Sequence, residues 1–263
     1  MSNKSDVRQS GLQPVSNRWL RGFRPIYQKE LAHWFGTGRW ISQLIIWMSL
    51  TAVPAIWMTP SSVTNRGVSF LTLFLWLGST LLSIGTIILV QGTIIEEKLT
   101  QTLIWICSKP LSRAAFILAK FAAYAIFIGS IALGVPAIFT YFAAVFAGLP
   151  SQISLLNYLV GVCMVYLLLL FNLALTLMLG AIFNRVGAVT AIALFVFLGG
   201  ASLNSNPQLR RIEPFTVWAL QGDATAAVVG LFSNEAWIAI SSTIMLTVLC
   251  LMVAVWWMKH YEL

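Results

Sequence analysis

Long apolar stretches separated by short polar connectors dominate this chain. A helix needs about 20 mostly apolar residues to cross a hydrocarbon core of roughly 30 Å. The stretches that reach or approach this length are 40–58, 68–90, 116–147, 155–183, 186–203 and 236–258. The pattern predicts an all-α integral membrane protein, with six transmembrane helices in one domain over residues 40–263.

The first 39 residues have a different pattern. Residues 1–16 are polar and lack periodicity, so we expect a disordered tail. Residues 17–39 interleave aromatic side chains with Arg, Lys and Glu. This composition is typical of an amphipathic helix that lies in the membrane interface, and Gly36 and Gly38 would allow a bend before the first span.

Charge sets the expected orientation. Only 9% of the residues are charged, against roughly 25% in soluble domains. With a cytoplasmic N-terminus, three basic residues face outside (Arg66, Arg210 and Arg211). Thirteen then face inside: Lys4, Arg8, Arg18, Arg21, Arg24, Lys29, Arg39, Lys98, Lys109, Arg113, Lys120, Arg185 and Lys259. This asymmetry predicts that both termini are cytoplasmic. The net charge of +8 then reflects topology and contact with membrane lipid, and we expect no nucleic-acid partner.

The connector at 204–235 is longer than the other outer connectors. It contains two apolar segments, Pro214–Leu220 and Ala224–Phe232, that are too short to span a bilayer. They suit short outer helices before the last span, at the membrane face or dipping between neighbouring helices. An ordinary surface hairpin is the alternative, and the sequence does not separate the two.

The polar connector between the second and third spans is the most informative part of the chain. Glu96 and Glu97 suit the first turn of a new helix, where the helix dipole favours negative charge. Apolar residues then recur at helical spacing and form one stripe: Ile95, Leu99, Leu103 and Ile106. Pro110 ends this helix, and Ser112 is placed to cap the next one.

This connector resembles the inner loop of type 2 ATP-binding-cassette (ABC) exporter permeases. The matching positions are Glu96 and Glu97 for an acidic cluster, Ser108, Pro110, Leu111, Ser112 and Arg113 for a turn, and Lys120 for a following lysine. A second match lies in the predicted interfacial helix, at Tyr27, Lys29, Glu30 and Leu31. The chain departs from the family pattern at Gln101, where a glycine normally precedes the threonine that is Thr102 here.

The resemblance implies a six-helix permease domain whose inner loop docks on a separate ATPase. The coupling loop would comprise Ile95, Glu96, Glu97, Leu99, Thr102, Leu103, Ile106, Pro110 and Arg113. Asn184 and Arg185 would form a smaller second contact, although a tight turn with one positive-inside Arg explains them equally well. The alternative for the loop helix is that it only seals the inner interface.

The same resemblance implies the partners and the location. Two cytoplasmic ABC ATPase subunits would bind ATP and Mg, and this chain would bind no cofactor itself. A second permease copy or a homologue would complete the complex in a bacterial or archaeal plasma (inner) membrane.

Catalytic and metal-binding chemistry is not indicated. The sequence has no phosphate-binding loop of the form Gly-x-x-x-x-Gly-Lys-Ser/Thr, so we expect this chain not to be an enzyme. His33, His260 and three scattered cysteines have no metal-ligand spacing. Asn172 is the polar span residue of most interest. An interhelical hydrogen bond is the favoured interpretation, and contact with a substrate is the alternative.

These observations predict an exporter permease, and the uncharged spans suggest an amphiphilic or hydrophobic cargo. In a subordinate version of this hypothesis, the ATPase is kept but the permease does mechanical work on a periplasmic partner instead of exporting a cargo. A membrane scaffold that anchors other proteins is the alternative from a different class. A secondary carrier is disfavoured because the spans lack ionisable groups near the midplane.

Overall fold

The computed structural model describes residues 22–60, 65–99, 112–148, 153–203 and 213–260, and all regular structure in them is helical. The α-helices are α1 (Phe23–Phe35), α2 (Arg39–Trp47), α3 (Val53–Trp57), α4 (Arg66–Leu77), α5 (Ser83–Val90), α6 (Ile95–Leu99), α8 (Arg113–Phe127), α9 (Val135–Phe146), α10 (Leu155–Ile182), α11 (Val186–Leu203), α12 (Ala219–Val228) and α13 (Asn234–His260). Three π-helical segments, η1 (Met48–Ala52), η2 (Gly78–Leu82) and η3 (Ile128–Gly134), and a 3₁₀ turn, η5 (Glu213–Phe215), complete the set. The predicted tail at 1–16 and most of the predicted coupling loop lie outside the described residues.

Among the described residues, five helices are long and apolar enough to cross a membrane. They are Arg39–Trp57, Arg66–Leu99, Arg113–Phe146, Leu155–Ile182 and Asn234–His260. The prediction of an all-α protein is therefore confirmed, and the long apolar helices indicate a multi-pass membrane protein. The fifth predicted span, 186–203, coincides with α11, whose described apolar part, Val186–Gly200, is shorter than the five long helices.

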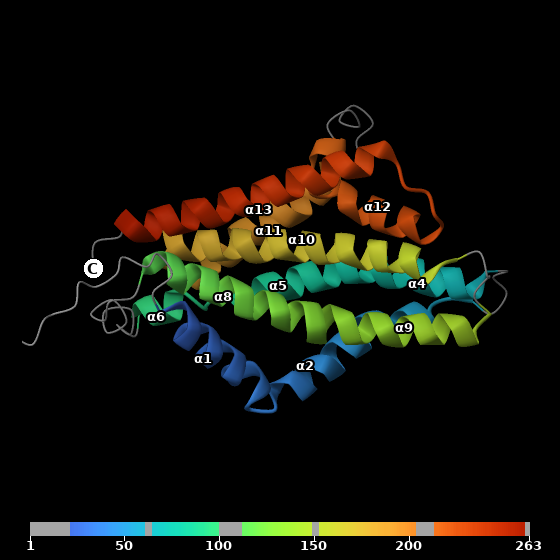
Figure 1. The fold of residues 1–263 in the computed structure, drawn as a ribbon, viewed down its shortest axis with the longest axis horizontal. Helices are drawn as coiled ribbons and strands as arrows, with labels where there is room; N and C mark the ends of the chain where they lie inside the picture. Colours follow the sequence, from blue (N-terminus) through green and yellow to red (C-terminus); the bar gives the residue numbers. More distant parts are fainter. Residues whose placement is uncertain (1–21, 61–64, 100–111, 149–152, 204–212, 261–263) are drawn as a thin grey trace, which may run out of the picture.

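Helix α10 lies at the centre of the bundle, with α13, α12, α5, α11 and α8 packed around it (Figure 1). A helix that is apolar on all sides is expected in such a buried position. Helices α1 and α2 form a V beside the bundle, joined at Gly36–Gly38 (Figure 1). Gly38 has a φ of 71°, a left-handed conformation that glycine adopts readily, so the predicted bend is present.

Two of the π-helical segments end two positions before a proline. Pro54 follows η1 and Pro136 follows η3. Proline has no backbone N–H and leaves a carbonyl one turn earlier without its usual donor. The wider π-helical turn shifts the hydrogen bonding, so that Val53 N–H bonds the carbonyl of Met48. These spans accommodate their prolines by local widening.

The connector before the last span contains a packed helix. Helix α12 contacts α10 and α4 along its apolar face. Close approach depends on Gly161 of α10, where an added Cβ would lie 2.7 Å from the carbonyl oxygen of Ala224. In its described residues, 213–233, the connector is helical at η5 and α12, and α12 packs against neighbouring helices, as the first of the two sequence interpretations expected. The bounds of α12 overlap the ends of both predicted segments and include the residues between them.

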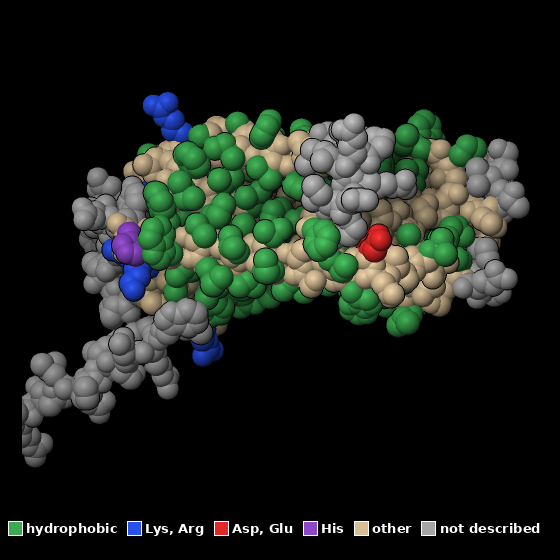
Figure 2. All heavy atoms as spheres, turned by 90° about the horizontal axis from the view of Figure 1, so that it is seen from above, with side chains coloured by type: hydrophobic (Ala, Val, Ile, Leu, Met, Phe, Trp, Pro, Cys, Tyr) green, Lys and Arg blue, Asp and Glu red, His purple; other side chains and the backbone are tan. Residues whose placement is uncertain are grey.

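Surface composition varies around and along the bundle. The membrane-crossing windows of Arg39–Trp57 and Asn234–His260 are only 22% and 28% buried, and hydrophobic side chains cover much of the face seen in Figure 2. Lys, Arg and His gather at one end in the same view. We call this the basic end; it carries Lys29, Lys98 and Arg113, and the other end, which carries Arg66, is the opposite end.

The polar residue singled out in the spans makes an interhelical bond. Asn172 Nδ2 donates to Ser83 Oγ of α5 at 3.0 Å and to the Leu168 carbonyl at 3.1 Å. The carbonyl of Asn172 accepts from Thr176 Oγ1. Its side-chain oxygen is buried and has no hydrogen-bond partner among the residues that the structure describes. The hydrogen-bonding interpretation of Asn172 therefore accounts for its amide nitrogen.

Candidate functional site

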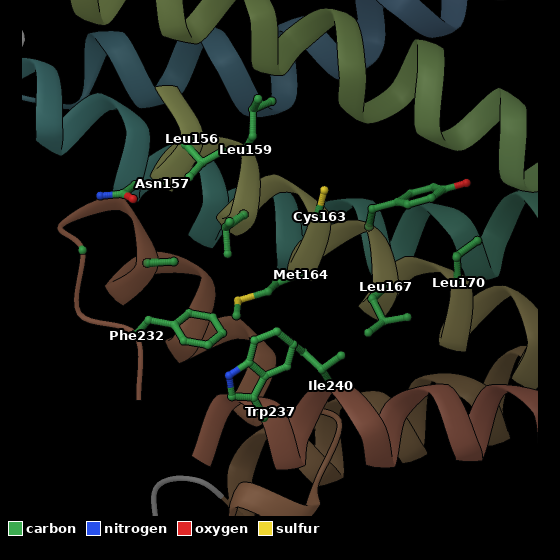
Figure 3. A pocket seen from close by; sticks show the side chains of 14 residues that line it. Leu156, Asn157, Leu159, Cys163, Met164, Leu167, Leu170, Phe232, Trp237 and Ile240 are labelled. Atoms are coloured by element: carbon green, nitrogen blue, oxygen red, sulfur yellow. The ribbon is translucent and has the colours of Figure 1, made fainter. Parts of the chain in front are cut away.

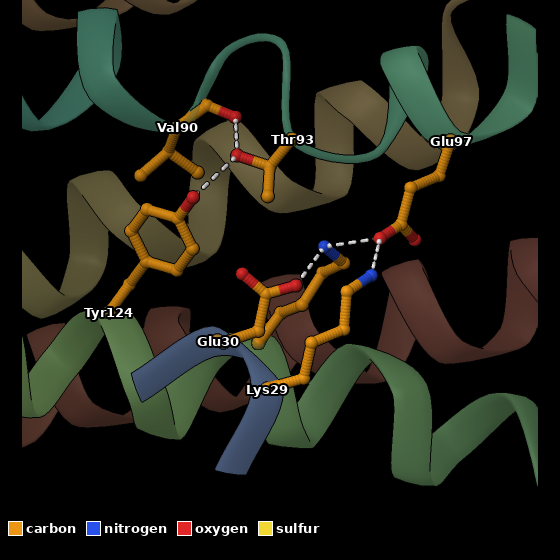
Figure 4. Close-up of polar contacts among 7 residues, drawn as sticks. Lys29, Glu30, Val90, Thr93, Glu97 and Tyr124 are labelled. Carbon is orange, nitrogen blue, oxygen red and sulfur yellow. Dashed lines mark hydrogen bonds and ion pairs between the residues drawn. The ribbon is translucent and has the colours of Figure 1, made fainter. Parts of the chain in front are cut away.

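A buried lysine joins three elements at the basic end. Lys120 of α8 has only 1% of its side chain exposed. Its Nζ lies 2.7 Å from Glu30 Oε1 of α1 and 3.1 Å from Glu97 Oε1 of α6 (Figure 4). Lys29 Nζ approaches the same Glu97 oxygen at 3.5 Å from an exposed position. We call Lys29, Glu30, Glu97 and Lys120 the ion cluster.

The ion cluster balances two positive and two negative charges. Moving a charge out of water costs several kcal/mol, so a buried ammonium needs close, well-oriented partners. The two carboxylates supply them, and the ring of Phe116 lies 5.2 Å from Lys120 Nζ and adds a cation–π contact. Within the described part of the chain, the second oxygen of Glu97, Oε2, is buried and has no hydrogen-bond partner. The ion cluster is thus electrostatically paired through one carboxylate oxygen of each glutamate.

Aromatic packing holds α1 against α8. Ile26, Glu30 and Trp34 recur every four residues and form the buried face of α1. The Trp34 ring stacks on Phe127 with centroids 4.1 Å apart and meets Tyr124 edge-on at 5.7 Å. This packing fixes the register at which Glu30 reaches Lys120.

The turn between α5 and α6 places Glu97. Thr93 Oγ1 donates to the Val90 carbonyl at 2.7 Å and to the Tyr124 hydroxyl at 3.5 Å, which ties the turn to α8 (Figure 4). Helix α6 then begins at Ile95 with two glutamates in its first turn. A polar cavity of about 650 Å³ lies between this turn and α1, and charged residues line much of it, including His33, Glu96 and the four members of the ion cluster.

Lys98 connects α6 to the end of α10. Its Nζ donates to the carbonyls of Gly180 at 3.0 Å and Ala181 at 2.6 Å, and to Asn184 Oδ1 at 3.3 Å. The last carbonyls of a helix carry partial negative charge and lack intrahelical donors, so a cation is favourable there. Lys98 therefore joins the first predicted contact region to the second, at 183–185.

Arg113 makes the equivalent connection to α13. Its Nη1 donates to the carbonyls of Met258 at 2.7 Å and Lys259 at 2.8 Å, in the last turn of that helix. Ser112 caps α8 as predicted, because its Oγ accepts from Ala115 N–H at 3.1 Å. The residues that flank the loop thus contact α1, α8, α10 and α13.

The structure divides the predicted coupling residues between interior and surface. Ile95 is fully buried and Glu97 belongs to the ion cluster, whereas Glu96 and Leu99 are exposed, Leu99 by 71%. The part of the predicted apolar stripe within α6 therefore does not face a single environment, because Ile95 is buried and Leu99 is exposed. Arg113, the first residue of α8, contacts the end of α13. The other four predicted loop residues, Thr102, Leu103, Ile106 and Pro110, lie outside the described residues.

The remaining predicted site residues lie nearby. Asn184 and Arg185 are exposed in the turn after α10. In α1, Lys29 and Glu30 join the ion cluster, Tyr27 stacks on Phe23 with centroids 5.7 Å apart, and Leu31 is half-buried. Sequence reasoning missed Lys98, because nothing in its neighbours signals an acceptor more than 80 positions away.

Metal chemistry finds no support in the described part of the chain, which holds no group of three or more His, Cys, Asp or Glu side chains able to bind an ion. No model of a known protein family matches the chain, and no curated protein matches it either.

Proposed function

We propose that this chain is the transmembrane permease subunit of an ABC transporter, an exporter driven by ATP that a separate cytoplasmic subunit hydrolyses. The observation that carries the proposal is the ion cluster. It joins the predicted interfacial helix, the start of the predicted coupling loop and the third predicted span through buried charges. A loop that only sealed the interface would have no need of such connections.

The contacts at the basic end would transmit a displacement of the loop. Glu97 bonds Lys120 of α8, Lys98 bonds the end of α10, and Arg113 bonds the end of α13. Each contact involves a charged group and is largely buried or directed at helix-end carbonyls. A movement of α6 would therefore shift three long helices together.

The proposed assembly contains two ATPase subunits and a second permease, identical or homologous. ATP and Mg would be bound by the ATPases in the cytoplasm of a bacterium or archaeon, beside the basic end. The cargo would be amphiphilic or hydrophobic, in keeping with spans whose polar groups are almost all neutral. Mechanical work on a periplasmic partner would use the same coupling contacts.

The exposed face of α6 is the part of the described loop open to a partner. Glu96 and Leu99 lie on it, while Glu97 points inward. A substitution at Leu99 should therefore weaken ATPase binding without disturbing the bundle. Leu231, at the opposite end and 70% exposed, provides a matched control.

The test is co-purification with the ATPase encoded beside this chain, in detergent, comparing wild type with Leu99→Ala and Leu231→Ala. We expect Leu99→Ala to lower the ATPase recovered and its activity, and Leu231→Ala to leave both unchanged. If no ATPase co-purifies with wild type, the exporter proposal fails and a membrane scaffold becomes the better hypothesis. A complex that is indifferent to Leu99→Ala, and to Glu96→Ala, would show that coupling does not use α6.

A further inference from the structure

An apolar cavity lies between α10, α12 and the first turns of α13 (Figure 3). Its volume is about 700 Å³, within the roughly 300–1,000 Å³ range of small-molecule sites. Met164 and Leu167 of α10 point across it toward Trp237 and Ile240 of α13 (Figure 3). It belongs to the half of the bundle away from the ion cluster.

The cavity is built by the arrangement of the helices. Helix α13 is inclined to α10, and the two separate toward the opposite end, where α12 lies (Figure 1). The chain leaves α12 through Gly230, whose φ of 77° favours glycine. Phe232 then packs edge-on against Trp237, with ring centroids 5.3 Å apart, and closes one side.

The lining is mostly apolar, with a side-chain amide near one end. The Asn157 amide lies there, in the first turn of α10, and makes no side-chain hydrogen bond within the part of the chain that the structure describes. From Leu156 to Leu170 the lining extends about 21 Å along α10. One leaflet contributes roughly 15 Å of hydrocarbon, so the cavity is long enough for most of a lipid tail.

The mouth of the cavity lies on the apolar side of the bundle. Leu156, Leu159 and Trp237 line it and are also exposed, by 70%, 47% and 63%. A helix of a second protein is too large for it: a helix 10–12 Å across and about 21 Å long occupies about 1,600–2,400 Å³. A single flexible hydrocarbon chain fits both the volume and the lining.

We propose that this cavity binds one acyl chain of a membrane phospholipid, with the polar end of the lipid near Asn157. Leaflet and cavity are equally apolar, so the preference comes from packing and from the Asn157 amide and not from the hydrophobic effect. The cavity therefore holds an acyl chain only modestly better than the surrounding leaflet does. The proposal does not depend on the proposed transport function, because it requires neither an ATPase nor a second subunit.

The test uses the full chain alone in phosphatidylcholine nanodiscs that contain a small fraction of phosphatidylcholine with a diazirine in the middle of one acyl chain. After irradiation, mass spectrometry locates the labelled residues. The variant Leu167→Trp fills the cavity, and Leu249→Trp, on the exposed face of α13 away from it, is the matched control.

We expect labelling of the cavity residues to saturate as the probe fraction rises and to exceed labelling of the exposed face of α9. It should fall several-fold in Leu167→Trp and persist in Leu249→Trp. Cavity labelling that rises in proportion to the probe, or that survives Leu167→Trp, would show ordinary lipid contact and overturn the proposal. Absence of label in the wild-type cavity would overturn it too, since the space would then hold something other than a lipid tail.

Discussion

Lys120 offers the sharpest test of the ion cluster. Replacing it with methionine keeps most of the side-chain volume and removes the charge, which leaves Glu30 and Glu97 without the cation between them. Lys29→Met is a matched control within the same cluster. The Lys29 side chain is 64% exposed and its Nζ lies 3.5 Å from Glu97, whereas the Lys120 side chain is 1% exposed and its Nζ lies 2.7 Å from its nearest carboxylate.

The expected magnitude follows from these distances. At an effective dielectric constant of about 20, the Coulomb energies of Lys120 with Glu30 and Glu97 are about 6 and about 5 kcal/mol. Desolvation of the ions offsets most of this gain, so the net contribution of the intact cluster is small. Removing only the cation forfeits the attraction and leaves the carboxylate desolvation uncompensated. We therefore expect Lys120→Met to destabilise the fold by about 3–5 kcal/mol, and Lys29→Met by about 0–1 kcal/mol.

The assay is reversible unfolding in mixed micelles with increasing sodium dodecyl sulfate, followed by tryptophan fluorescence. The triple variant Lys120→Met, Glu30→Gln, Glu97→Gln removes all three buried charges and should recover most of the loss. Equal effects of Lys120→Met and Lys29→Met would refute the reasoning, because burial would then make no difference. Failure of the triple variant to recover stability would show that packing, and not charge, is responsible.

Three further predictions concern the rest of the bundle. Gly161→Ala should lower the free energy of unfolding by about 1–3 kcal/mol, since its Cβ would press on α12, whereas Gly187→Ala in α11, with open space around it, should be neutral or stabilising in the same assay. Asn172→Leu should leave the free energy of unfolding nearly unchanged, because the loss of one interhelical hydrogen bond worth about 0.6 kcal/mol is offset by removing an unpaired buried oxygen. A decrease in the free energy of unfolding of more than about 2 kcal/mol would contradict this. Burial, and then the negative charges of Glu213 and Glu235, raise the pKa of Asp223 above its ordinary 3.8. The folded state therefore holds this proton more tightly than the unfolded state does. The free energy of unfolding then falls as the pH rises from the ordinary pKa to the raised one. Asp223→Asn should therefore raise the melting temperature at pH 7 and lose this advantage near pH 4; an equal gain at both values would exclude the carboxyl charge as the cause.

The sequence predicts the helices better than the contacts between them. Span lengths follow from the apolar runs, and the bend at Gly38 and the cap at Ser112 follow from local chemistry. The environment of a charged side chain does not, because it depends on residues far along the chain: Lys120 meets Glu30 across 90 positions. Similarly, Ile95 and Leu99 share a helical face in the sequence pattern, yet α6 is only one turn and a half long. Its ends therefore meet different surroundings, the core at Ile95 and the surface at Leu99.

The direction of the helices explains why basic residues form so many connections at one end. Helices α5, α10 and α13 all run toward the basic end and finish there, so their last carbonyls place partial negative charge among the lysines and arginines. In the proposed orientation the basic end is cytoplasmic, where Lys and Arg are enriched, and the alternation of spans supplies these cations with acceptors. Lys98 of α6 donates to the last carbonyls of α10, and Arg113 of α8 donates to the last carbonyls of α13. At the opposite end, α10 and α13 separate around the apolar cavity. The charged contacts that join α6 to α8, α6 to α10 and α8 to α13 thus lie at the basic end, where the proposed coupling to an ATPase would act.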